Sequence, residues 1–127
     1  MTNLLFYISL VFAGGSGALL RYLLGRVTIN LGWAALPFGT LIANVLGCFL
    51  MGFLSWVIVD KWHFSPQAQT IVLTGFLGGF TTFSAFSLET VNLLQQGESV
   101  KAFLYVGLTV VLCIFVCIAG IALAKQM

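Results

Sequence analysis

Charged residues are scarce in this sequence, and their scarcity excludes most classes of protein. Only 6% of the 127 residues are charged, whereas a soluble domain normally carries about a quarter. Three acidic and five basic residues cannot form a basic surface for nucleic acid or an acidic tail. Because 61% of the residues are hydrophobic, we expect an all-α integral membrane protein with no room for a domain outside the membrane.

Groups that perform chemistry or bind metals are also few. The single histidine, His63, lies in a predicted loop without a candidate ligand nearby, so we interpret it as an interfacial residue. Cys48, Cys113 and Cys117 fall inside hydrophobic runs with no histidine or carboxylate close in sequence. Cys113 and Cys117 share a helix face, but small apolar packing is favoured over a metal pair or a disulfide. The sequence therefore contains no constellation typical of an enzyme.

A basic segment is missing at the amino terminus, where the first 13 residues otherwise resemble a signal peptide. Because hydrophobic residues resume after Gly14-Gly15-Ser16-Gly17, we interpret this region as the first of four spans. The chain, residues 1–127, is then a single four-span membrane domain. The predicted helices run about Leu4 to Leu24, Leu36 to Val59, Pro66 to Leu94 and Ala102 to Ala124.

The loops lack a bias in positive charge. With both termini on one side, that side holds Lys61 and Lys125, and the other holds Arg21, Arg26 and Lys101. Such a small difference gives the chain no strong preferred orientation in the membrane. We therefore expect dual topology, in which two oppositely inserted copies pair as an antiparallel homodimer.

The third predicted span contains an unusual segment, Gly75 to Ser87. Ser65 can cap a helix that begins at Pro66, and the ten residues Ala68 to Leu77 rise about 15 Å. That distance is half of a hydrocarbon core about 30 Å thick, so Gly78 and the residues after it fall near the midplane. Backbone that leaves the helix there must line a cavity or be buried in protein. Free carbonyls at such a break favour a cation, and free N–H groups favour an anion.

The residues around the glycine pair are hydroxyl-bearing and aromatic in alternation. A Gly-Gly packing notch is the alternative interpretation of this segment, and glycine pairs usually serve that purpose. The density of hydroxyls and rings favours a pore or a binding site instead. The members are Thr81, Thr82, Ser84 and Ser87, interleaved with Phe80, Phe83 and Phe86.

Polar residues in the other spans are candidate partners of this segment. Asn44 lies in the second span with Thr40 one turn before it, and is either interhelical glue or a pore donor. Tyr105 and Thr109 fall on one face of the fourth span, which we expect to meet the hydroxyls of the third.

Two charged residues lie within predicted spans. Arg21 stands three quarters of the way along the first, where snorkelling to the interface is favoured over a role in attracting anions to a pore vestibule. Glu89 follows the predicted break, and it either pairs with a neighbour or reaches the surface.

Three motifs together resemble the bacterial Fluc-type fluoride channels. The segment Gly78 to Ser87 resembles their third-span signature, and Gly39 to Gly47 resembles that of the second span. Gly14 to Ala18, followed by Arg21-Tyr22, is similar to their first span. The likeness covers all four spans and nearly the whole chain.

The resemblance implies a dual-topology antiparallel dimer that exports fluoride passively through two pores across the bacterial inner membrane. It also implies a third helix broken at the midplane and a central structural sodium ion (Na+) held by backbone carbonyls of Gly78 and Thr81 from both subunits. To the pore residues that it implies we add Thr40 and Arg21. The pore set is then Asn44, Phe83, Phe86, Ser84, Thr82, Tyr105, Thr109, Thr40 and Arg21.

Other functions fit less well. A small multidrug-resistance-type four-span exporter is the main alternative, but its proton-coupled exchange needs a glutamate in the first span, and this span has no carboxylate. A scaffold protein would explain neither a midplane break nor its hydroxyl and aromatic residues. A comparison of fluoride efflux with chloride efflux from liposomes that contain the purified protein would distinguish a fluoride channel from these other classes.

Overall fold

The computed structural model describes residues 3–127, so Met1 and Thr2 of the amino-terminal segment lie outside it. All regular structure in the described residues is helical, with no strand among them. The helices η1 and η2 have the wider π-helical hydrogen bonding. The elements in order are α1 (Asn3–Asn30), α2 (Phe38–Ser55), η1 (Trp56–Lys61), α3 (Pro66–Gln69), η2 (Thr70–Leu77), α4 (Gly78–Phe80), α5 (Phe83–Gln95) and α6 (Ser99–Ala124).

Four segments are long and apolar enough to cross a membrane, which confirms the four predicted spans. They are Asn3–Asn30, Phe38–Lys61, Pro66–Gln95 and Ser99–Ala124. The first is longer than predicted, so that Arg26 lies on the helix rather than beyond it. This helix ends before Gly32, whose left-handed φ of 75° allows the N–H of Trp33 to bond back to the carbonyl of Thr28.

The predicted start of the third span is also confirmed. The side chain of Ser65 accepts a hydrogen bond of 3.3 Å from the N–H of Ala68, and Pro66 occupies the first turn. The preceding link contains His63, which is exposed, with its Nδ1 3.1 Å from the carbonyl of Val59.

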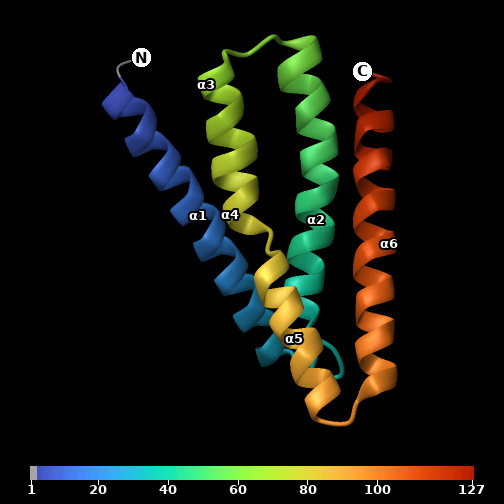
Figure 1. Ribbon diagram of the computed structural model, residues 1–127. Helices are drawn as coiled ribbons and strands as arrows, with labels where there is room; N and C mark the ends of the chain where they lie inside the picture. Colours follow the sequence, from blue (N-terminus) through green and yellow to red (C-terminus); the bar gives the residue numbers. More distant parts are fainter. Residues whose placement is uncertain (1–2) are drawn as a thin grey trace.

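Figure 1 shows how the four spans are arranged. Helices α2 and α6 run side by side in the same direction, and α1 leans across the third span, which comprises α3, η2, α4 and α5. The chain changes direction between α4 and α5, about halfway along the bundle. The carboxyl-terminal part of the third span, α5, packs against α6.

Glycines bring the spans into backbone contact. A Cβ atom at Gly52 of α2 would collide with the carbonyl of Cys117, and one at Gly120 of α6 would collide with the carbonyl of Phe49. On the other side of the bundle, a Cβ atom at Gly17 of α1 would collide with the carbonyl of Phe76. Small residues at these crossings permit the close approach that holds membrane helices together.

We expect Gly52→Ala to destabilise the fold by about 1–3 kcal/mol, because the added methyl group forces α2 away from α6. Thermal denaturation in detergent measures the change. Gly107→Ala is the matched control, since a Cβ atom at this α6 position meets no atom within 4 Å. Equal melting temperatures for the two variants would contradict the proposed backbone contact.

Candidate functional site

The helix of the third span is interrupted at two threonines. Thr81 (φ −88°, ψ 158°) and Thr82 (φ −154°, ψ 124°) are extended, between α4 and α5. The glycine pair Gly78-Gly79 is helical, with Gly78 at φ −62° and ψ −36°. Gly79 allows the third span to pack against α1, because a Cβ atom at this position would collide with the carbonyl of Gly14.

Asn44 of α2 binds the extended segment with both ends of its amide. Its Nδ2 donates to the carbonyl of Thr82 (2.9 Å), and its Oδ1 accepts from the N–H of the same residue (2.7 Å). The side chain is only 8% exposed. Gly47, one turn further along α2, allows the approach, since a Cβ atom there would collide with Thr81 Cγ2. Of the two open interpretations of Asn44, these contacts support interhelical glue, and the second N–H of its amide is additional donor capacity.

Two backbone carbonyls lose their helical partners at this interruption. In a continuous helix the N–H of Thr82 would bond to the carbonyl of Gly78, but it donates to Asn44 instead. Likewise the N–H of Ala85, which would bond to the carbonyl of Thr81, donates to Thr82 Oγ1 at 3.1 Å. Side-chain oxygens therefore accept the N–H groups that would otherwise bond to the carbonyls of Gly78 and Thr81, the two carbonyls that the family resemblance implies as sodium ligands. Oxygen atoms freed in this way are suited to a hard cation.

Arg21 reaches this region from α1. Its Nε donates to the carbonyl of Gly79 at 3.3 Å, and the residue is half-buried. This contact differs from the favoured expectation that the side chain would snorkel to the interface. The carbonyls at the end of a helix carry partial negative charge, which attracts the guanidinium.

Glu89 of α5 lies outside the predicted pore set, and of its two expected arrangements the structure shows pairing with neighbours. Thr40 Oγ1 donates to its Oε1 (2.7 Å), and Tyr105 Oη donates to its Oε2 (2.6 Å). These donors come from α2 and α6, so the carboxylate joins three helices. The signal in the sequence was a carboxylate within an apolar span, with hydroxyl groups in two other spans.

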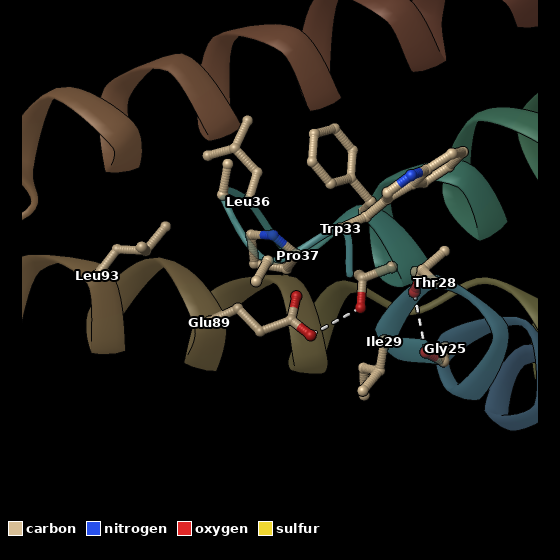
Figure 2. Close-up of a pocket in the computed structure, with 13 residues that line it drawn as sticks. Gly25, Thr28, Ile29, Trp33, Leu36, Pro37, Glu89 and Leu93 are labelled. Carbon is tan, nitrogen blue, oxygen red and sulfur yellow. Dashed lines mark hydrogen bonds between the residues drawn. The ribbon is translucent and has the colours of Figure 1, made fainter. Parts of the chain in front are cut away.

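The Glu89 carboxylate also lines a cavity of about 340 Å³ at one end of the bundle. Figure 2 shows this carboxylate near Pro37, with Trp33 and Leu36 of the link between α1 and α2 on the same cavity. Thr28 lies on the α1 side, where its hydroxyl donates to the carbonyl of Gly25.

A second cavity, of about 300 Å³, opens beside the interrupted segment between α2, α5 and α6; we call it the Thr109 groove. Thr109, which is only 6% exposed, lies in the wall of this groove. Its buried Oγ1 has no hydrogen-bond partner among residues 3–127. Phe83 and Phe86 also line the groove, with ring centroids 5.4 Å apart. Phe83 is 77% exposed, whereas Phe86 is 6% exposed and packs on Tyr105.

Comparisons with known proteins place the chain in a family. A profile of the family described as CrcB-like protein, Camphor Resistance (CrcB), matches residues 8–121. The chain belongs to this CrcB-like family. Proteins named "Fluoride-specific ion channel FluC" are similar to it over nearly their whole lengths. That of Shewanella denitrificans is 48% identical (94% of each chain), that of Rhizobium meliloti 43% (95% of this chain, 98% of the relative), and that of Rhizobium johnstonii 41% (94% and 96%).

These relatives are named as ion channels and not as enzymes, and the CrcB-like chain is a multi-pass membrane protein. Five of its predicted pore residues line one cavity. Asn44, Thr82, Phe83, Phe86 and Thr109 line the Thr109 groove. The other four predicted pore residues do not line the groove. Ser84 Oγ is 3.2 Å from Thr82 Oγ1, Thr40 and Tyr105 donate to Glu89, and Arg21 donates to the carbonyl of Gly79.

We expect Asn44→Ala to destabilise the CrcB-like fold strongly. The change leaves the N–H and the carbonyl of Thr82 unpaired inside a span, at about 1–3 kcal/mol for each group. Asn92→Ala is the matched control, because that amide is exposed on α5 and its loss should change the free energy of unfolding by less than about 0.5 kcal/mol. Unfolding in detergent compares the variants, and similar stabilities would show that the Thr82 contacts are unimportant.

Proposed function

We propose that this CrcB-like protein is a fluoride-specific ion channel whose conduction path includes the Thr109 groove. The observation that carries the proposal is the buried, unpartnered hydroxyl of Thr109 beside the two phenylalanine rings. A buried polar group without a partner is costly, and for this reason we assign the Thr109 hydroxyl a ligand. The names of relatives 40–48% identical over nearly the whole chain support fluoride as that ligand.

Fluoride is small and strongly hydrated, so a channel must replace its water with donors. The Thr109 hydroxyl and the second N–H of Asn44 can supply hydrogen bonds in the groove, with the hydroxyls of Thr82 and Ser84 close by. The edges of Phe83 and Phe86 carry partial positive charge and bind an anion only weakly. Weak contacts of this kind let fluoride leave again, and the larger chloride ion fits them poorly.

The proposed channel is an antiparallel dimer of two copies of this chain. An antiparallel second copy would cover the exposed ring of Phe83 and give each of two pores aromatic edges from both subunits. The third span would then be broken at the midplane, where the two copies cross. Movement of fluoride through such pores is passive, and the proposed location is the bacterial inner membrane.

A central sodium ion fits the oxygen atoms at the interruption. The carbonyls of Gly78 and Thr81 have lost their helical donors to side chains, and these two carbonyls from each subunit would hold the ion. No group of three or more His, Cys, Asp or Glu side chains suited to a metal occurs in the described part of the chain, so backbone oxygen is the fitting ligand. The positive charge would offset the partial charges of the converging helix ends.

Thr40, Tyr105 and Arg21 have supporting roles in this proposal. Thr40 and Tyr105 hold the Glu89 carboxylate between α2, α5 and α6, and Arg21 places a positive charge beside the interruption. The four-span multidrug exporter is not favoured, because the relatives are named as fluoride channels.

We expect Thr109→Val to reduce fluoride flux at least about tenfold, the equivalent of one lost hydrogen bond of about 1.4 kcal/mol. Valine keeps the shape of threonine and removes an unsatisfied hydroxyl, so the stability of the fold should be unchanged or higher. Fluoride efflux from liposomes, per folded protein and beside chloride efflux, measures the effect.

Thr70→Val is the matched control for this variant, because the Thr70 hydroxyl donates to the carbonyl of Pro66 in the first turns of the third span and Thr70 does not line the groove. Its fluoride efflux should equal that of the unmodified protein. Normal efflux in Thr109→Val, or an equal loss in both variants, would remove the Thr109 groove from the conduction path.

Dual topology predicts that Lys61 and Lys101 are each reached from both sides of the membrane. Lys61 ends η1 and Lys101 lies in the first turn of α6, at opposite ends of the bundle. A membrane-impermeant amine reagent added to intact vesicles should label about half of each lysine, and peptide mass spectrometry reads the two sites separately. Labelling of one lysine alone from outside would mean a single orientation and no antiparallel pair.

A further inference from the structure

The parallel packing of α2 and α6 sets two cysteines opposite each other. Gly52 of α2 lies against the backbone of Cys117 on α6, and both helices run in the same direction. One turn earlier on each helix are Cys48 and Cys113. Cys48 and Cys113 are accordingly side-chain neighbours across the helix interface.

Both thiols open on the same cavity. Cys48 and Cys113 line the Thr109 groove, are half-buried and are not joined in a disulfide. Cys117 is also free and half-buried, but it does not line the groove. No third His, Cys, Asp or Glu completes a metal-binding cluster within residues 3–127. A metal held here must therefore accept two sulfur ligands.

We propose that Cys48 and Cys113 form a two-coordinate site for the soft divalent cation Hg²⁺ in the wall of the Thr109 groove. Thiolate sulfur prefers soft metals, whereas Zn²⁺ usually takes four ligands in proteins. In the reaction the two S–H groups release two protons, and two S–Hg bonds form without any change of oxidation state. The product is electrically neutral, which suits a site inside a membrane span.

A Hg²⁺ ion bound between Cys48 and Cys113 would narrow the Thr109 groove. Thr109 lies one turn before Cys113 on α6, and Asn44 lies one turn before Cys48 on α2. A metal bridging the two cysteines therefore sits one turn away from the proposed fluoride contacts, in the same cavity. Hg²⁺ should block fluoride efflux; this consequence rests on the proposed function, whereas the binding site does not.

Metal binding is tested without reference to transport. The reduced, purified protein is given mercuric chloride and then an excess of glutathione, whose own thiol competes for Hg²⁺ held by a single cysteine. Intact-mass spectrometry should find one Hg²⁺ per chain, and thiol titration should show that one of the three cysteines still reacts. Zinc chloride under the same conditions should not be retained.

Variants identify the ligands. Cys48→Ser and Cys113→Ser should each retain at least about tenfold less Hg²⁺ after glutathione, because a single thiol has no chelate advantage. Cys117→Ser is the matched control and should retain the metal fully. Cys48→Ala and Cys113→Ala repeat the test if a serine variant melts at a lower temperature. Retention by the Cys48 or Cys113 variants, or loss in Cys117→Ser, overturns the assignment.

Fluoride efflux separates the site from the proposed function. Each variant is compared with its own fluoride efflux before Hg²⁺ is added. Block by Hg²⁺ in the unmodified protein and in Cys117→Ser, but not in Cys48→Ser, supports both the metal site and the proposed function. Retained Hg²⁺ with unchanged efflux keeps the metal site and overturns the groove as the conduction path. Absence of retained Hg²⁺ overturns the metal site and leaves the Thr109→Val test of the groove unaffected.

Discussion

The pair of hydrogen bonds between Asn44 and the backbone of Thr82 is the interaction on which the interrupted span depends. A membrane offers no water to satisfy backbone groups that leave a helix, so a side chain must replace the missing partners. The Asn44 amide supplies a donor and an acceptor at 2.9 and 2.7 Å. Because it takes the N–H of Thr82, it also leaves the carbonyl of Gly78 without its helical donor.

That pair of bonds requires close contact between helices, and glycine provides it. Gly47 lets α2 approach the threonines, while Gly79 lets the third span approach the backbone of α1 at Gly14. The same crossing brings Arg21 of α1 to the carbonyl of Gly79. Packing by small residues and the exposure of backbone oxygen are thus two results of one arrangement.

Hydrogen bonding distinguishes two kinds of polar residue within the bundle. The Glu89 carboxylate accepts hydrogen bonds from the hydroxyl groups of Thr40 and Tyr105, and this hydrogen-bond network joins three helices. Thr109, one turn from Tyr105 on the same face of α6, has no partner in the part of the chain that the structure describes. A satisfied network holds helices together, whereas an unsatisfied hydroxyl beside a cavity is available to a ligand, and for this reason we propose the Thr109 groove as the fluoride path.

The sequence alone determined the membrane class, the four spans and the helix start at Ser65, because these depend on hydrophobic run length and local capping. It also indicated most of the residues that gather at the site. Only the tertiary structure decided that the interruption falls on Thr81 and Thr82, that Asn44 binds backbone, and that Glu89 joins three helices.

The tertiary structure also decided that Cys48 lies opposite Cys113. Each of these features depends on which helix faces meet and in what register. That register is set by backbone contacts at glycines such as Gly52, between residues far apart in the chain. Hydrophobicity and spacing within one helix carry no information about such contacts, so the partners had to come from the folded structure.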